Sequence, residues 1–253
     1  MLFDLRHIYA GYNGKTILRD INFTINSGDF IGIIGPNGGG KTTLLKVLLD
    51  IIEPIRGEII TSDKILSPGS KSIGYLPQYS DFDRRFPVTI EDIVLSGFIT
   101  RGKLFQRYKA EEKTRATSLM KEMGIYSIRK SPASEISGGQ LQRALLCRAL
   151  ASDPEILILD EPNTYVDNQF EHELYDRLVK YNNQGKAILL VTHDVGTVSY
   201  YIKTIACVNE TLHYHNSNII TEQQLASYNC PLQIITHGDV PHTVLKKHDH
   251  FHE

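Results

Sequence analysis

The sequence predicts an α/β fold built around a parallel sheet, and three stretches of the chain carry this prediction. Each is a short apolar run that leads into glycine-rich or polar residues: Phe30–Ile34, Ile156–Leu159 and Ala187–Val191. Such runs are typical of strands buried in a parallel sheet, whose carboxyl ends bring functional groups to one edge. At 253 residues the chain is long enough for one large α/β domain with a subdomain and a tail.

The amino-terminal residues 3–34 are predicted to form strands joined by turns. Turn candidates lie at Tyr12–Lys15, between Leu5–Tyr9 and Thr16–Ile25, and at Ser27–Asp29. Tyr12 has two readings from the residues alone. It is either a half-exposed tyrosine at a strand end or a ring that returns to a nucleotide bound further along the chain.

A phosphate-binding loop is predicted at Gly35–Thr42, whose sequence is GPNGGGKT. It stands between an apolar strand and the helical stretch Thr43–Leu49, which is the context that a P-loop requires. Glycines let backbone N–H groups converge on a phosphate, and the helix adds its positive dipole end. Lys41 would reach the β- and γ-phosphates, and the Thr42 hydroxyl would ligate Mg²⁺. The predicted nucleotide contacts are Gly35, Pro36, Asn37, Gly38, Gly39, Gly40, Lys41, Thr42 and Thr43.

Beyond the P-loop helix, two short strands are predicted at Gly57–Thr61 and Ile73–Leu76. Gln78 follows the second strand. It is either a polar loop residue or the source of an amide oxygen for a bound cation, because such oxygens suit hard metals. Residues 79–135 are charged and helical, with Thr89 as a helix N-cap, which indicates a small helical subdomain attached to the core.

The next segment, Ser137–Gln140, is predicted to open a helix with a capping box, in which Ser137 is the N-cap and Gln140 the third helical residue. Gly138 and Gly139 leave backbone N–H groups accessible behind the cap, which favours a second anion site. The alternative is an ordinary capped helix without a ligand.

Polar residues follow the two later apolar strands. Asp160 is predicted to hold Mg²⁺ and Glu161 to polarise the attacking water. His193 follows the last strand; a histidine there is usually only a satisfied polar group. Because it would share a sheet edge with Lys41, Asp160 and Glu161, contact with the γ-phosphate is the favoured reading.

Composition narrows the function classes. The net charge of −2 argues against a dedicated nucleic-acid binder. Cys147, Cys207 and Cys230 match no metal or disulfide motif, which suits a reducing cytosol, and Cys147 reads as a small buried hydrophobe. The amino terminus does not have the pattern of a signal peptide, and no run approaches the about 20 apolar residues of a membrane span. A role at a membrane would therefore need another chain to span it.

The motifs together resemble the nucleotide-binding subunit of ABC transporters. Gly35–Thr42, Gln78, Ser137–Gln140, Ile158–Glu161 and His193 stand in the order of that family's Walker A, Q-loop, signature, Walker B and switch-histidine motifs. The resemblance places Tyr12 on the adenine ring and Asp167 in the D-loop. It implies a P-loop NTPase fold of ABC type, with a RecA-like core, an antiparallel β subdomain and an α-helical subdomain.

That resemblance also sets the expected boundaries and partners. The ATPase domain would cover residues 1–225, with the helical subdomain at about 79–152, and a polar tail would follow at 226–253. ATP and Mg²⁺ are the implied cofactors. ATP would join two copies of the chain. The chain would act at the cytoplasmic face of the membrane on an integral membrane permease. The permease would dock on Gln78 and residues 79–89. The sequence departs from the family pattern at three places. Ile136 stands where leucine is usual, and in the P-loop Gly39 replaces a small side chain and Thr42 a serine. The D-loop residues 164–166 are atypical.

Two shorter stretches are similar to importers of zinc and manganese: Arg85–Gly97 and His237–His242. They imply that a divalent metal is the cargo and that an extracytoplasmic metal-binding protein delivers it. An importer of another solute, such as a siderophore or cobalamin, is the first alternative. Others are an ABC ATPase acting on nucleic acid or ribosomes, and a metal-sensing module with a degenerate ATPase. His248, His250 and His252 would either bind Zn²⁺ or form a solvated polar terminus.

Overall fold

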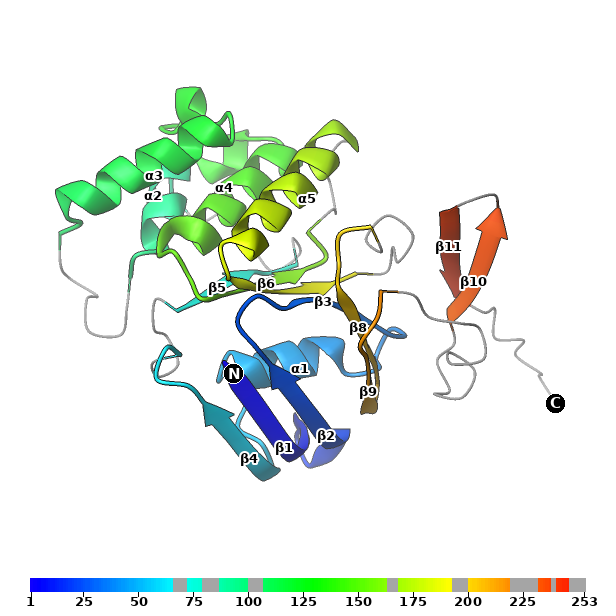
Figure 1. Ribbon diagram of the computed structural model, residues 1–253. Coiled ribbons are helices and arrows are strands. Elements are labelled where there is room, and N and C mark those ends of the chain that lie inside the picture. The colour runs from blue at the N-terminus through cyan, green and yellow to red at the C-terminus, as the bar shows by residue number, and fades with distance from the viewer. Residues whose placement is uncertain are drawn as a thin grey trace. The chain divides into compact units, whose positions relative to one another are not determined.

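The computed structural model describes most of the chain, and the chain divides into two compact units (Figure 1). The described residues are 1–65, 72–78, 87–99, 107–162, 168–192, 200–218, 232–237 and 240–245. We call one unit the helical unit: Met1–Phe3, Ile25–Asp29 and Thr61–Leu190. The other, the P-loop unit, consists of Asp4–Thr24, Phe30–Ile60 and Val191–Glu253.

A three-stranded sheet with the order β2-β1-β4 lies mostly in the P-loop unit. Its strands are β1 (Phe3–Tyr12), β2 (Lys15–Ile25) and β4 (Arg56–Thr61). The turn between β1 and β2 has positive φ at Asn13 (50°) and Gly14 (77°), as a tight type I′ hairpin requires. Along β2, buried Ile21, Phe23 and Ile25 alternate with exposed residues, so one face of the strand is packed. The predicted turn and both predicted strands are confirmed.

The P-loop unit also contains the strand that leads into the glycine-rich loop. All five residues of β3 (Phe30–Ile34) are buried, and β3 pairs in parallel with β8 (Thr204–Asn209). The antiparallel strand β9 (Thr211–His215) pairs with β8. The sequence predicts edge strands at Ile205–Val208 and Leu212–His215; both strands are present, but only β9 lies at the edge, because β8 lies between β3 and β9. Helix α1 (Lys41–Leu48) follows the loop and buries its apolar face.

The helical unit contains the strands that end in the predicted catalytic residues. Strand β5 (Ile73–Leu76) pairs in parallel with β6 (Ile156–Asp160), in a register that places Leu76 opposite Leu159. Strand β7 (Ala187–Val191) is the neighbour of β6 on its other side. Every residue of β6 and β7 is buried, as expected for strands inside a parallel sheet.

Helices α2, α3 and α4 pack against one another in the helical unit (Figure 1). The helices of this unit are α2 (Ile90–Ser96), α3 (Ala110–Glu122), α4 (Gly138–Ala151) and α5 (Asn168–Asn183), with 3₁₀ turns at Tyr126–Ile128 and Ala133–Glu135. Thr89 caps α2 through a capping box with Asp92, which confirms the predicted helix start. In α4 the Cys147 side chain is fully buried, and burial raises the pKa of its thiol to about 12. Cys147 is therefore an inert core residue, as predicted.

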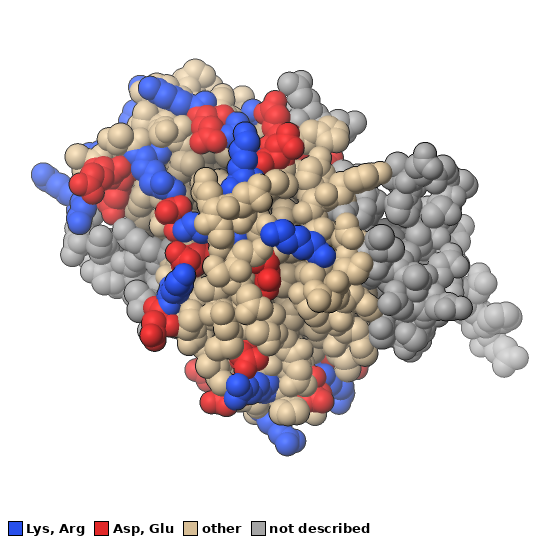
Figure 2. All heavy atoms as spheres, in the orientation of Figure 1, with Lys and Arg blue, Asp and Glu red and all other residues tan. Residues whose placement is uncertain are grey.

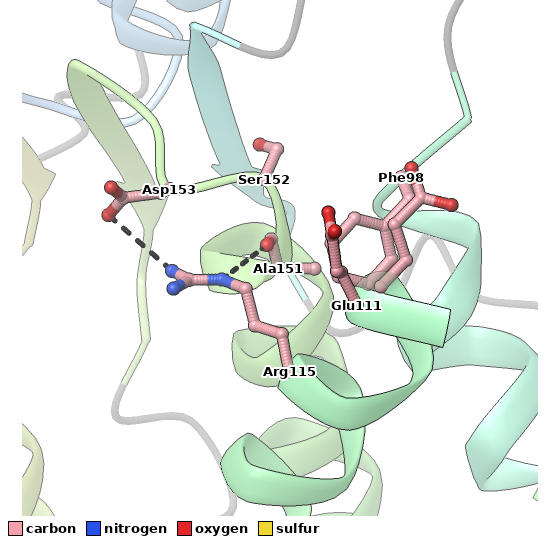
Figure 3. A pocket seen from close by; sticks show the side chains of 7 residues that line it. Phe98, Glu111, Arg115, Ala151, Ser152 and Asp153 are labelled. Atoms are coloured by element: carbon pink, nitrogen blue, oxygen red, sulfur yellow. Dashed lines mark hydrogen bonds and ion pairs between the residues drawn. The ribbon is translucent and has the colours of Figure 1, made fainter. Parts of the chain in front are cut away.

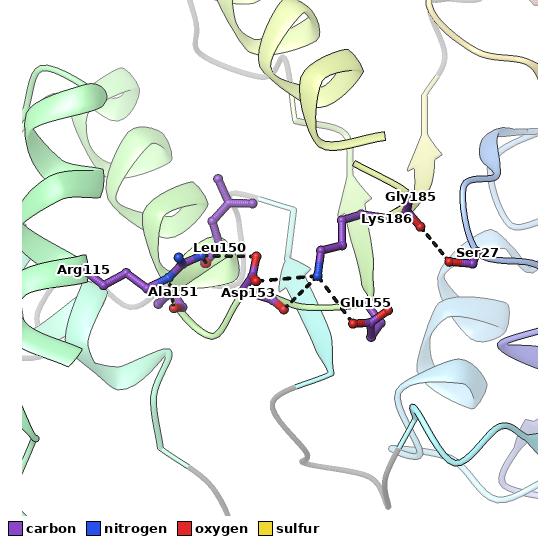
Figure 4. Close-up of polar contacts among 8 residues, drawn as sticks. All are labelled: Ser27, Arg115, Leu150, Ala151, Asp153, Glu155, Gly185 and Lys186. Carbon is purple, nitrogen blue, oxygen red and sulfur yellow. Dashed lines mark hydrogen bonds and ion pairs between the residues drawn. The ribbon is translucent and has the colours of Figure 1, made fainter. Parts of the chain in front are cut away.

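Ionic and hydrogen-bonded contacts tie α3 to the ends of neighbouring elements (Figure 4). The Arg115 guanidinium donates from Nε to the Ala151 carbonyl oxygen at 2.7 Å and forms an ion pair with Asp153 at 3.4 Å. Lys186 lies 3.7 Å from the same carboxylate and 3.5 Å from Glu155. Exposed ion pairs contribute only about 0–1 kcal/mol each, so the main effect of Arg115 is to satisfy the carbonyls of Leu150 and Ala151 at the end of α4.

The molecular surface in Figure 2 carries Lys and Arg side chains interspersed with Asp and Glu. Arg177 pairs with Glu122 across α5 and α3, and Lys130 pairs with Glu91 near the start of α2. In the part of the chain that the structure describes, no helix is both long and apolar enough to cross a membrane.

A hairpin within the carboxy-terminal region was not predicted from the sequence. Strands β10 (Leu232–His237) and β11 (Val240–Leu245) pair in antiparallel fashion, with His237 opposite Val240. The signal that could have identified it is local: apolar and β-branched residues flank a two-residue connection that contains glycine. His248, His250 and His252 lie outside the described residues, so the two readings of the tail stay as they were.

Candidate nucleotide-binding and hydrolysis site

Two residues of the glycine-rich loop have positive φ and close neighbours, a combination that favours glycine. Gly35 has φ of 150°, and a Cβ atom there would lie 2.0 Å from the carbonyl oxygen of Val208 in β8. Gly40 has φ of 101°, and a Cβ atom there would lie 2.5 Å from the Leu18 side chain. The loop also makes backbone hydrogen bonds, from Gly39 N to Pro36 O and from Glu210 N to Gly39 O. Its backbone is therefore held in one conformation by the strands around it.

Helix α1 begins at the end of this loop without a side-chain cap. Gly40 is the N-cap and makes no side-chain capping bond, and the first turn contains no acidic residue. The first N–H groups of a helix point out of its N-terminus, and together with the helix dipole they favour an anion at this position. Asn37, Gly38 and Thr42 are exposed, whereas Thr43 is 5% exposed.

Lys41 is the first residue of α1, and its side chain folds back over the loop. Its Nζ atom donates to the carbonyl oxygens of Gly35 and Pro36, each at 2.9 Å, and the residue is 7% exposed. The two bonds hold the ammonium group against the loop; its contact with the β- and γ-phosphates stays a prediction.

Tyr12 ends β1 and lies beside the helix that follows the loop. The residue is 38% exposed, and Lys46 Nζ of α1 lies 5.6 Å from the ring centroid. This contact connects the ring to α1, and its partial exposure leaves aromatic surface accessible. The stacking role on adenine stays a prediction.

In the helical unit, the parallel register of β5 and β6 brings Gln78 to Glu161. Gln78 lies two residues beyond β5, Glu161 directly follows β6, and Gln78 Nε2 donates to Glu161 Oε2 at 2.9 Å. Because the amide nitrogen takes this bond, the amide oxygen is the atom that Gln78 can offer to a cation. Asp160, the last residue of β6, is 4% exposed. Glu161 itself has φ of 50°, a conformation that is strained for a side chain of its kind.

The predicted capping box at the start of α4 is present. Ser137 Oγ accepts from the Gln140 backbone N–H at 3.2 Å, and Gln140 Oε1 accepts from the Ser137 N–H at 2.9 Å. The first turn of α4 carries no acidic residue, and Gly138 and Gly139 are half-buried. Both readings of this segment, an anion site and a plain helix cap, are compatible with this geometry.

A surface pocket of about 210 Å³ in the helical unit has no predicted motif residue in its lining (Figure 3). It is formed where the ends of α2 and α4 meet the start of α3, and its lining includes Phe98, Arg115 and Asp153. This pocket therefore does not coincide with the predicted nucleotide contacts.

The predicted site residues fall on both units of the chain. Tyr12 and Gly35–Thr43 lie in the P-loop unit, whereas Gln78, Ser137–Gln140 and Asp160 with Glu161 lie in the helical unit. His193 and the D-loop residues 163–167 lie outside the described residues, as do residues 79–86 of the expected permease-docking segment.

Comparison with known families agrees with these motifs. Residues 18–164, more than half of the chain, match the sequence profile of the family described as ABC transporter. The chain belongs to the ABC transporter family. As a member of it, the chain is an ATP-binding and ATP-hydrolysing protein with a P-loop ABC-type fold. The matched segment includes the P-loop, Gln78, the signature and the end of β6.

Two curated relatives and one solved structure show how far the similarity extends. The high-affinity zinc uptake system ATP-binding protein ZnuC of Bacillus subtilis is 35% identical over 208 residues, covering 81% of this chain and 89% of that protein. The manganese transport system ATP-binding protein MntB of Listeria monocytogenes is 34% identical over 240 residues, covering 94% and 97%. A metal-chelate type ABC transporter solved in an inward-facing conformation matches with a TM-score of 0.78 and 25% identity, covering 97% of this chain and 98% of that chain.

Proposed function

We propose that this ABC ATPase powers the import of a divalent metal ion, zinc or manganese, through a separate membrane permease. The observation that carries the cargo assignment is the length of the match to the manganese relative, which extends over 94% of this chain and so includes residues beyond the ATPase motifs. The zinc relative supports the same class of cargo. The ATPase domain is assigned to residues 1–225, with a helical subdomain at about 79–152 and a tail at 226–253.

Hydrolysis in this proposal depends on positioning and charge stabilisation. The P-loop backbone and Lys41 bind the β- and γ-phosphates, and Tyr12 stacks on the adenine ring. Glu161, which Gln78 holds by its carboxylate, orients the attacking water and accepts its proton. His193 contacts the γ-phosphate. These groups act together to stabilise the charge that develops on the transferred phosphoryl group.

The residues assigned to Mg²⁺ fit that ion by their chemistry. Thr42, Gln78 and Asp160 offer a hydroxyl, an amide oxygen and a carboxylate, all of which are the hard oxygen ligands that Mg²⁺ prefers. Asp160 is buried at the end of β6, the edge of the sheet from which a parallel strand presents its side chains to a ligand. When bound, the ion neutralises charge on the β- and γ-phosphates.

Removing divalent cations is expected to abolish turnover while ATP binding persists with reduced affinity. The reason is that the P-loop backbone and Lys41 bind phosphate without the ion, whereas hydrolysis requires its charge. The measurement is ATP hydrolysis and fluorescent-nucleotide binding with excess chelator, followed by addition of Mg²⁺. Asp160→Asn should require more Mg²⁺ for half-maximal rate than the parent chain. Full hydrolysis in chelator would rule out this assignment.

The signature segment indicates that two copies of the chain work together. We infer that Ser137–Gln140, which lies in the helical unit and opens α4 with a capping box, is a second anion site and that it meets ATP bound to the P-loop of a second copy. ATP would then join the two subunits, and hydrolysis would release them. The chain would lie at the cytoplasmic face of the membrane, with its permease docked near Gln78 and with an extracytoplasmic protein delivering the metal.

Vesicles that contain the chain together with its permease test the cargo. We expect ATP supplied to the ATPase chain to drive uptake of Zn²⁺ or Mn²⁺ into the vesicles. The metal should also stimulate ATP hydrolysis. The measurement is radioactive metal uptake in parallel with phosphate release, with Glu161→Gln vesicles as the inactive control. If a siderophore or cobalamin stimulated ATP hydrolysis and neither metal did, that solute would be assigned as the cargo. Salt-sensitive binding of nucleic acid without any metal uptake would rule out the proposed role in import.

A further inference from the structure

Gln142 is a buried amide in α4 that makes one long-range hydrogen bond. The residue is 1% exposed, and its Nε2 atom donates to the carbonyl oxygen of Pro162 at 2.8 Å. It lies in the second turn of α4, two residues after the capping Gln140. The bond therefore joins the helix that begins with the signature segment to the turn that follows β6.

Burial of the Gln142 amide lowers the stability of the folded chain. Its Oε1 atom is buried and has no hydrogen-bond partner among the residues that the structure describes. A buried polar atom without a partner costs about 1–3 kcal/mol, so an apolar side chain of similar volume would suit this position at least as well for stability alone. The polar side chain at this position therefore calls for a functional explanation.

The acceptor of this bond adjoins the predicted catalytic carboxylate. Pro162 directly follows Glu161, whose φ of 50° is a strained conformation. Such a conformation persists only where the surroundings hold it in place. Gln78 holds the Glu161 carboxylate at 2.9 Å, and Gln142 holds the backbone one residue further on.

We propose that Gln142 is a positioning residue that transmits the state of the signature segment to Glu161. The proposal rests on the proposed function, in which Ser137–Gln140 of one copy meets ATP bound to the other. Helix α4 is continuous from Gly138 to Ala151, so a displacement at its first turn moves Gln142 in the second turn as well. Gln142 passes this movement to the Pro162 carbonyl and so to the backbone of Glu161. ATP bound at one site thereby aligns the carboxylate that acts at the other site.

Gln142→Leu removes the donor and preserves most of the volume. We expect kcat for ATP to fall about ten- to a hundredfold, as for a misplaced catalytic group, with little change in KM. The Hill coefficient for ATP should fall from about 2 towards 1, because the two sites lose their connection. The measurement is steady-state hydrolysis by the full chain over a range of ATP concentrations.

Asn182 provides a matched control in the same unit. It is 4% exposed, and its Nδ2 atom donates to the carbonyl oxygens of Gly28, Asp29 and Lys186, each at 3.0 Å. Asn182→Leu removes buried amide hydrogen bonds of the same kind that do not touch the turn after β6. It should lower the thermal unfolding temperature without changing the Hill coefficient. Loss of cooperativity in both variants would show a general packing effect and overturn the proposal.

Gln142→Glu gives a second readout in case Gln142→Leu folds poorly. A carboxyl group can donate to the Pro162 carbonyl only when it is protonated, and burial raises the pKa of a carboxyl. We expect kcat of Gln142→Glu to recover relative to the parent as the pH falls, a shift in pH profile that a purely structural role would not produce. An unshifted profile would overturn the proposal.

The same measurements distinguish failure of the two-copy mechanism from failure of the role assigned to Gln142. A parent chain with a Hill coefficient of one and no ATP-dependent dimer would remove the two-copy mechanism, and the coupling with it. A cooperative parent whose Gln142→Leu variant stays equally cooperative would remove only the role of Gln142.

Discussion

Glu161→Gln is expected to bind ATP normally, to lose about 10²–10⁴-fold in turnover, and to accumulate as a dimer while ATP is present. An amide cannot accept the proton of the attacking water. Its oxygen can still accept the hydrogen bond from Gln78 Nε2, so the turn after β6 keeps its structure. The measurements are single-turnover hydrolysis, nucleotide affinity and size-exclusion chromatography with and without ATP.

Glu155→Gln is the control for this substitution. Glu155 precedes the other end of β6 and pairs with Lys186 at 3.5 Å, so the same chemical change occurs on the same strand away from the turn at Glu161. It should hydrolyse ATP at the parental rate. Undiminished turnover in Glu161→Gln would remove Glu161 from its role, and failure to form a dimer with ATP would contradict the two-copy mechanism.

Gly35→Ala is expected to abolish ATP binding and to destabilise the chain. The new Cβ atom would lie 2.0 Å from the Val208 carbonyl oxygen, and β8 cannot easily retreat because it pairs with β3 on one side and β9 on the other. Overpacking of this kind costs about 3 kcal/mol, which corresponds to a fall in Tm of roughly 6–12 °C for a chain of this size. Fluorescent-nucleotide titration and thermal unfolding measure the two effects.

Gly38→Ala separates the steric clash from backbone strain. Gly38 also has a positive φ, 76°, but a Cβ atom there has nothing within 4 Å. This variant should lose only about 1–2 kcal/mol of stability and retain measurable ATP binding. Equal behaviour of the two variants would show that the contact with β8 is not what shapes the loop.

Local patterns explain which parts of the fold and site could be predicted from the sequence. The loop Gly35–Thr42 and the capping box of Ser137 with Gln140 are formed by residues close together in the chain, so their chemistry is readable without tertiary structure. The buried strands could be predicted for the same reason, because each is a short apolar run bounded by polar residues or glycine.

Long-range pairings explain what could not be predicted. Gln78 and Glu161 were each predicted as site residues, but their hydrogen bond depends on the register of β5 against β6, which no local pattern reveals. Gln142 gave no signal at all. It occupies an ordinary helical position, and its partner is a backbone carbonyl, a group that every residue carries.

The hydrogen bonds of Lys41 have a consequence for nucleotide affinity. Its ammonium group already has two carbonyl acceptors, the oxygens of Gly35 and Pro36, so its charge is solvated by the loop's own dipoles. When a triphosphate binds, its oxygens therefore replace carbonyl oxygens as acceptors of the Lys41 ammonium group; they do not stabilise a cation that had no partner before. The gain from Lys41 is the difference between a charged and a neutral acceptor, which is smaller than the strength of the new bond itself.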